Sequence, residues 1–157
     1  METTQNPTAS ATPPSPPRFV VKGQYIKDLS FENPHAPGSL LAFKDKPNLE
    51  VSVDLKAQKI KDDLYELVML LSARASHDSN TLFLVELAYS GIFQLINVPE
   101  EHVEPLLLVD APFVLFPFAR RVVSDVSRDG GFPPLMLEPI DFHSLYRQNK
   151  EAVKKSA

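Results

Sequence analysis

The residues best suited to chemistry are two acids in the stretch YIKDLSFENPHAP, residues 25–37. If this stretch is a strand, Asp28 and Glu32 share a face but lie about 13 Å apart, at roughly 3.3 Å per residue. Carboxylates that cooperate in glycoside hydrolysis lie closer, at about 5–9.5 Å. A helix would place like charges at i, i+4 and would run into Pro34. The spacing therefore predicts a strand with an acidic face rather than an acid-base pair, and the simplest interpretation is a solvated face.

Other catalytic patterns are missing from the sequence. It has no cysteine, so it has no disulfide, Cys nucleophile or thiolate metal site. There is no G-x-S-x-G elbow, and RDGGFPP lacks the Lys and Ser or Thr of a phosphate-binding loop. The isolated histidines are interpreted as surface or structural residues: His35, His77, His102 and His143. We therefore expect no cofactor, no metal and no enzymatic activity, and a small-molecule enzyme on an α+β scaffold is the disfavoured alternative.

Length and composition narrow the class of protein. The 157 residues suit one domain, and a formal net charge of −4 argues against nucleic acid as a partner. The same charge weakly favours basic partners. No apolar stretch approaches the roughly 20 residues that a membrane span requires, and the N-terminus has no apolar run typical of a signal peptide. We expect a cytoplasmic protein.

The acids must be positioned by strands, which fill the first half of the chain. In LEVSVDLK, residues 49–56, apolar and polar side chains alternate strictly, as in a half-buried strand. LYELVMLLSARAS and TLFLVELAYSGIF continue the pattern and are separated by the polar turn HDSN. RFVVKGQYIKDLSF adds a fourth strand, with Gly23 as a plausible bulge. These runs predict a four-stranded antiparallel sheet.

The second half of the chain has helical patterns. PEEHVEPLLLV predicts a helix that Pro105 shortens or kinks, and a longer helix is expected from near Pro117 to DGG, with Gly130 as a left-handed cap. Asp141 is the predicted N-cap of a terminal helix. Strands followed by helices indicate an α+β fold. We expect a disordered, Pro-rich tail over 1–17, a folded domain over 18–149 and a flexible polar tail over 150–157.

The sequence contains more large apolar side chains than the core of a small domain can bury. In TLFLVELAYSGIF, Leu84 and Glu86 lie opposite the apolar face, which resembles a contact patch. The loop over 33–48 contains Leu40, Leu41 and Phe43, which either cover a core or line a groove. APFVLFPFA carries three more aromatic residues: Phe113, Phe116 and Phe118. Some of this surface must enter a subunit interface or a binding surface.

The patterns in YIKDLSFENPHAPGS, TLFLVELAYSGIF and LFPFARRVVSDVSRDGGFPPLMLEPIDF closely resemble those of the SecB family of bacterial protein-export chaperones. The resemblance covers most of residues 18–146, in the family's order and spacing. It implies a four-stranded antiparallel sheet with helices on one side. It also implies a homotetramer, a dimer of dimers whose long helices lie between the sheets.

The resemblance further implies a function without ATP. Members hold unfolded precursor proteins and pass them to the SecA motor ATPase for export. Carried onto this chain, the SecA contacts are Asp28, Glu32, Leu84 and Glu86, which are also the residues that spacing places on outward faces. The predicted client groove is lined by Leu40, Leu41, Phe43, Ile92, Phe93 and Phe113. An alternative is a SecB-like chaperone dedicated to an antitoxin, and the basic end KEAVKKSA departs from the acidic C-termini of several relatives.

Overall fold

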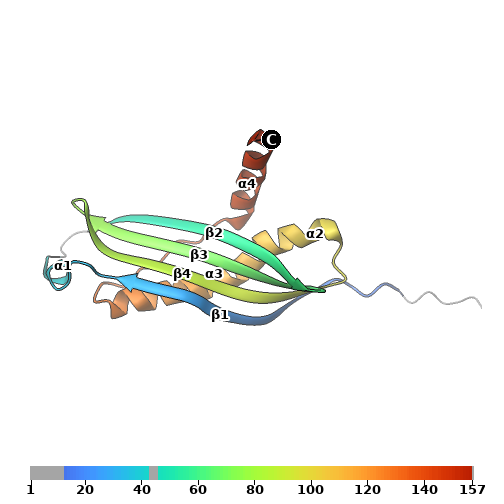
Figure 1. The fold of residues 1–157 in the computed structure, drawn as a ribbon, viewed down its shortest axis with the longest axis horizontal. Coiled ribbons are helices and arrows are strands. Elements are labelled where there is room, and N and C mark those ends of the chain that lie inside the picture. Colours follow the sequence, from blue (N-terminus) through green and yellow to red (C-terminus); the bar gives the residue numbers. More distant parts are fainter. Residues whose placement is uncertain (1–12, 43–45, 157) are drawn as a thin grey trace, which may run out of the picture.

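Four long strands form one antiparallel sheet in the order β1-β4-β3-β2 (Figure 1). The computed structural model describes residues 13–42 and 46–156. The strands are β1 Arg18–Glu32, β2 Asn48–Lys61, β3 Leu64–His77 and β4 Asn80–Ile96. The predicted four-stranded antiparallel sheet is confirmed, and HDSN forms the tight β3–β4 turn, with Asp78 and Ser79 at positive φ.

The edge strand β1 carries two irregularities in its pairing with β4. The register shifts between Val21 and Gly23, beside the predicted bulge, and again between Ile26 and Asp28. Lys22 and Lys27 are therefore extra residues in β1. The second shift was not predicted, and it changes which side chains of β1 face which side of the sheet.

The helices that follow the sheet are α2 Glu100–Pro105, α3 Ala111–Asp129 and α4 Phe142–Ser156, with a π-helical turn η1 over Leu106–Asp110 between the first two. The predicted start of the long helix near Pro117 is wrong, because α3 begins at Ala111 and Pro117 lies inside it. The wider turn of η1 follows Pro105 directly and lets the helical path continue. Gly130 ends α3 in a right-handed conformation, and Gly131, with φ of 94°, takes the left-handed one.

The helix α3 lies along one face of the sheet, and α4 stands away from it (Figure 1). We call this side the helix face and the opposite side the outward face. Leu115, Ala119 and Val123 of α3 are buried against the odd-numbered residues of β3 and β4, which form the core. Phe142 joins α4 to the core by an edge-on contact with Phe116, at 6.0 Å between ring centroids. One layer of helix on one layer of sheet confirms the predicted α+β class.

The terminal helix α4 begins as predicted. The Asp141 carboxylate accepts a hydrogen bond from the Ser144 backbone N–H at 3.1 Å and another from the Ser144 hydroxyl at 2.7 Å. This is the N-cap arrangement that satisfies a free donor of the first turn. The helix runs to Ser156, so residues 150–156 are helical and exposed. The flexibility expected of them stays a prediction, as does that of the 1–17 tail, of which residues 1–12 lie outside the described residues.

Candidate functional site

The pairing of β1 with β4 brings the predicted docking residues together on the outward face. Glu32 lies opposite Leu84, and Glu86 lies two positions along β4, opposite Ser30. Asp28 lies opposite Ala88, the next outward residue of β4. Residues directly opposite each other in an antiparallel pair project to the same side. The three acids are exposed and Leu84 is half-buried, so they form one accessible patch.

The acidic patch extends across the sheet to β2. Glu86 lies opposite Ser72 of β3, which lies opposite Ser52 of β2. In the next outward row, Ala88 lies opposite Leu70, which lies opposite Asp54 of β2. Asp28, Asp54 and Glu86 line a shallow depression of about 240 Å³. The alternation in LEVSVDLK already indicated that Asp54 faces solvent, but the strand order was needed to place it on the same depression as Asp28, across β3 and β4. We call the acids Asp28, Glu32, Asp54 and Glu86, together with Leu84, the docking face.

A cluster around Glu66 adjoins the docking face. Glu66 lies on β3, is only 7% exposed, and accepts hydrogen bonds from the Tyr25 hydroxyl, from Lys27 Nζ at 3.0 Å and from Gln58 Nε2 at 3.0 Å. The Tyr25 hydrogen bond, followed by those from Lys27 and Gln58, holds the pKa of Glu66 below its ordinary value, although burial opposes this. Burial and the adjacent Glu66 carboxylate raise the pKa of Tyr25 to about 12, so the phenol keeps the proton that it donates.

The lowered pKa of Glu66 predicts a pH-dependent stability. A carboxyl group with a depressed folded-state pKa contributes stability above its ordinary pKa of 4.5, and this is lost as the pH falls through the lower folded value. Glu66→Gln should therefore reduce the free energy of unfolding most at neutral pH, and the gap to the wild type should narrow below pH 4.5. Urea unfolding at several pH values and one protein concentration measures this.

The matched control for that measurement is Glu86→Gln. Glu86 is an exposed acid of the neighbouring strand, and it makes no ion pair or side-chain hydrogen bond with the described residues. Its replacement should change the unfolding free energy little at any pH. A Glu66→Gln gap that stays constant from neutral to acid pH would contradict the assigned role of the carboxylate.

The six predicted groove residues do not lie together. Leu41 is 82% exposed and Phe113 is 73% exposed, as a binding role requires. Phe93 is fully buried, with its ring stacked on Phe19 at 5.1 Å, so the structure removes it from the groove. Ile92 lies on the outward face, opposite Gly23 and Glu66, because side chains alternate along β4. Phe43 lies outside the described residues.

The first part of the 33–48 loop is attached to the end of α3. The short helix α1, Gly38–Leu41, leaves Ser39 buried, and the Ser39 hydroxyl donates to Asn33 Oδ1 at 2.8 Å. Leu40 packs so closely on Gly131 that an added Cβ would lie 2.9 Å from it. Leu40 is therefore anchored, and Leu41 beside it is left free to contact another molecule.

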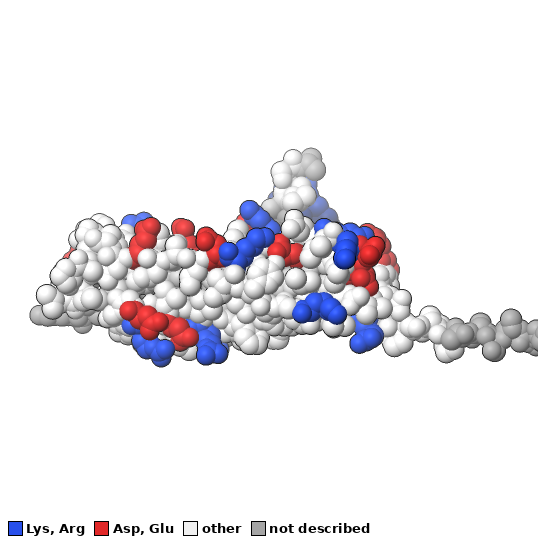
Figure 2. Space-filling model, turned by 60° about the horizontal axis from the view of Figure 1, so that its bottom comes forward, with Lys and Arg blue, Asp and Glu red and all other residues white. Residues whose placement is uncertain are grey.

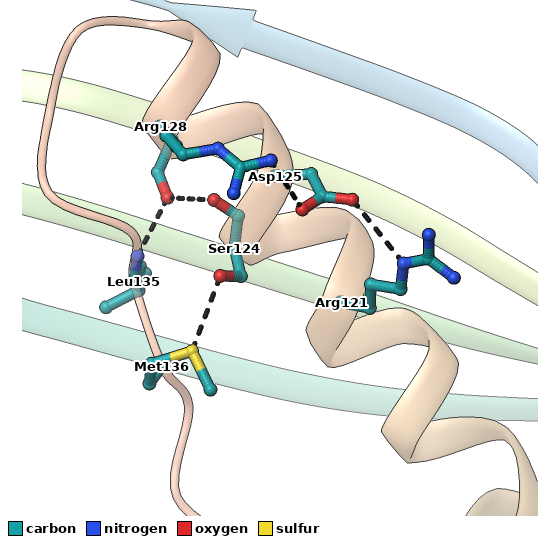
Figure 3. A network of polar contacts seen from close by, with 7 residues as sticks. Arg121, Ser124, Asp125, Arg128, Leu135 and Met136 are labelled. Carbon is teal, nitrogen blue, oxygen red and sulfur yellow. Dashed lines mark hydrogen bonds and ion pairs between the residues drawn. The ribbon is translucent and has the colours of Figure 1, made fainter.

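The segment after α3 folds back along that helix (Figure 3). The buried Ser127 hydroxyl accepts a hydrogen bond from the Leu135 backbone N–H at 2.8 Å and donates to the Ser124 carbonyl at 3.0 Å. On the same helix, Asp125 bridges Arg121 and Arg128 at 3.6 and 3.2 Å. The Ser124 hydroxyl also lies 3.4 Å from Met136 Sδ, so Ser127 and Ser124 fix residues 135 and 136 against α3, while the Met136 side chain stays 63% exposed.

Sequence reasoning missed an apolar cleft beside α4. It has a volume of about 390 Å³ and is lined by Leu55, Leu108, Leu145, Tyr146 and Val153, with Glu104, Asn149, Lys150 and Lys154 also in its wall. Lys150 bridges its two sides, because its Nζ lies 3.4 Å from Glu104 and 5.4 Å from the Tyr146 ring centroid. The i, i+3, i+4 spacing of Phe142, Leu145 and Tyr146 was the available signal.

One side of the molecule shows how charge and uncharged surface are distributed (Figure 2). Acidic and basic side chains gather in small groups, and broad uncharged areas lie between them.

In the part of the chain that the structure describes, no group of three His, Cys, Asp or Glu residues could hold a metal ion. No described helix is both long and apolar enough to cross a membrane.

The sequence matches the family described as preprotein translocase subunit SecB over residues 12–153. The chain belongs to the SecB family. Curated SecB relatives named protein-export protein SecB agree over nearly the whole length. That of Rhodopseudomonas palustris strain TIE-1 is 45% identical over 93% of this chain and 94% of its own. That of Nitrobacter winogradskyi is 47% identical over 95% and 93%.

A solved structure supports the SecB fold. It is the SecB-like chaperone of Mycobacterium tuberculosis in complex with a peptide from an antitoxin. Its TM-score is 0.63 at 14% identity, and the match covers 78% of this chain and 88% of that one. The predicted family and its α+β fold are therefore confirmed, and the docking and groove residues are carried forward as proposals.

Proposed function

We propose that the protein is an ATP-independent cytoplasmic holdase, and not an enzyme, that binds unfolded precursor proteins and delivers them to the SecA motor ATPase for export. The observation that carries the proposal is the exposure of large apolar side chains around the helices, chiefly Leu41, Phe113 and Met136. Such side chains attract apolar segments that a folded protein hides in its core. The names of the curated relatives support export as the purpose.

Client binding needs apolar area and no demanding pattern of hydrogen bonds. Burying about 600 Å² of apolar surface gives on the order of 15 kcal/mol, at about 25 cal/mol per Å². Ordering of the client and the loss of translational freedom offset much of this, so the net affinity is moderate. Leu41, Phe113 and Met136 are the proposed client contacts, and the cleft beside α4 adds a separate pocket for an apolar side chain.

Self-assembly is part of the proposal. Phe118 on α3 and Leu49 and Val51 on the helix face of β2 are all at least 40% exposed in the single chain. A homotetramer arranged as a dimer of dimers would cover such side chains between its sheets. Four copies would also bring several client sites together, which increases avidity without new contacts.

The docking face is proposed to receive SecA. Its acids suit a basic partner surface, and electrostatic docking is separable from apolar client capture. The alternative of a dedicated antitoxin chaperone has weaker support. The SecB-like chaperone solved with an antitoxin peptide is 14% identical and so informs on the fold alone, whereas the relatives at 45–47% identity are named for export.

Native mass spectrometry with and without an unfolded polypeptide tests the proposed function. We expect a tetramer that forms a complex with the unfolded polypeptide in the absence of ATP, and no complex with the same polypeptide after it has folded. Binding that required ATP, or equal binding of the folded form, would contradict a holdase.

A further inference from the structure

The docking face depends on one extra residue in β1. Tyr25 and Asp28 are three positions apart, yet they lie opposite Ser90 and Ala88, which are two positions apart and share a face. The extra residue is Lys27, at the register shift between Ile26 and Asp28. A bulge of this kind re-aims the side chains that follow it.

Without the bulge the acids would face the wrong way. Strict alternation from Tyr25 would turn Leu29 and Phe31 outward and would turn Asp28 and Glu32 toward the core. In the structure Phe31 packs on the helix face, where its ring stacks on Phe83 at 5.8 Å. The single extra residue therefore keeps Phe31 inside and presents both acids to solvent.

The Lys27 side chain is held across the sheet. Its Nζ lies 3.0 Å from Oε1 and 3.3 Å from Oε2 of Glu66, a residue of β3 that is separated from β1 by β4. Tyr25 and Gln58 hold the same carboxylate from β1 and β2. Glu66 is thus held by three side chains from two strands, β1 and β2, and Lys27 is fixed by Glu66.

The other bulge of β1 offers a natural comparison. Lys22 is the extra residue at the shift between Val21 and Gly23. It is exposed, and it makes no ion pair or side-chain hydrogen bond within the described residues. A bulge in β1 therefore does not require an ion pair in general, and the bond to Glu66 distinguishes the bulge that precedes Asp28.

We propose that Lys27 and Glu66 are positioning residues of the docking face, whose ion pair fixes the β1 bulge and thereby the placement of Asp28 and Glu32. The inference rests on the proposed docking of SecA. It predicts a change in SecA affinity that is opposite in sign to the change expected from charge alone. Removing the positive charge of Lys27 makes the face more acidic and would, by charge alone, strengthen binding of a basic partner. Loss of the bulge geometry weakens binding instead.

The test compares SecA affinity, by calorimetry, for four variants of the full chain. Lys27→Met should bind SecA about fivefold to tenfold more weakly, as when one charged contact of an interface is displaced. Lys27→Arg, which keeps the ion pair, and Lys22→Met, which removes the same charge at the other bulge, should bind as the wild type does. Glu86→Lys should lose binding. Amide hydrogen exchange over residues 26–32 should accelerate in Lys27→Met alone.

Each other outcome overturns a defined part of the argument. Wild-type or tighter SecA binding by Lys27→Met, or equal weakening by Lys22→Met, would overturn the positioning role. Normal binding by Glu86→Lys would overturn the docking face itself. In that case hydrogen exchange alone decides whether Lys27 fixes the bulge, and unchanged exchange in Lys27→Met would overturn that as well.

Discussion

Reversing the charges of Asp28 and Glu86 together, by Asp28→Lys and Glu86→Lys, should weaken SecA binding by roughly two orders of magnitude. Both carboxylates are exposed on the outward face and line the same depression, so the double variant turns the centre of an acidic surface basic. Neither makes an ion pair with the described residues, so the fold should tolerate the change. Calorimetric titration of SecA into the protein measures the loss.

A matched control separates the local effect from net charge. Glu138→Lys combined with Glu151→Lys makes the same change in net charge at two exposed acids away from the docking face. This control should bind SecA nearly as the wild type does, with a modest loss that salt removes. Both double variants should retain affinity for an unfolded polypeptide. Equal loss of SecA and client binding in the docking-face variant would indicate misfolding and would contradict separate surfaces.

Replacing Leu41 and Phe113 by serine should weaken client binding by about a hundredfold. Fully burying one large apolar side chain contributes about 1.5–3 kcal/mol, so two of them account for such a change. Both side chains are more than 70% exposed in the single chain, and their loss should therefore leave the stability of the fold nearly unchanged. Fluorescence anisotropy with a labelled unfolded polypeptide measures the affinity.

The control for this variant is Ile60→Ser, which removes a half-exposed apolar side chain at the far end of β2. It should not change client affinity. Native mass spectrometry of the double variant decides between two roles for Phe113. A smaller assembly than that of the wild type would assign Phe113 to a subunit interface, whereas an unchanged assembly with unchanged client affinity would contradict the groove.

Much of the fold followed from local patterns. Alternation with period two predicted the strands β2, β3 and β4, because each has one face on the core and one toward solvent or a partner. The same alternation placed Leu84 and Glu86 together, and the spacing of Asp28 and Glu32 placed them on one side of β1. The N-cap at Asp141 was predictable because the capping contact with Ser144 lies within one turn.

In the helical half of the chain, packing against the sheet overrides some of the expectations from local sequence. Pro105 was expected to shorten or kink its helix, and α2 does end there, with the wider turn of η1 directly after it. Pro117 was expected to start the long helix, yet α3 begins at Ala111 and runs through Pro117 to Asp129. Burial of Leu107, Ala111 and Leu115 against the sheet stabilises a continuous path through residues that lack a backbone donor. Phe93 and Phe113 were both predicted to line the groove. Phe93 is buried instead, as its odd-numbered position on the apolar face of β4 indicates, whereas Phe113 is exposed.

By itself, the sequence determined the α+β class, the four strands, the family resemblance and the acids of β1 and β4, since these depend on residue types at short spacing. Only the tertiary structure decided which acids share one surface depression. The strand order and registers place Asp54 and Asp28 at opposite sides of one depression that crosses the sheet, and the Lys27 bulge turns Asp28 outward while Phe31 stays in the core. The partner that holds that bulge, Glu66, is 39 residues from Lys27 along the chain. Contacts at that separation depend on strand pairing and on the burial of a shared core, and no local spacing encodes them.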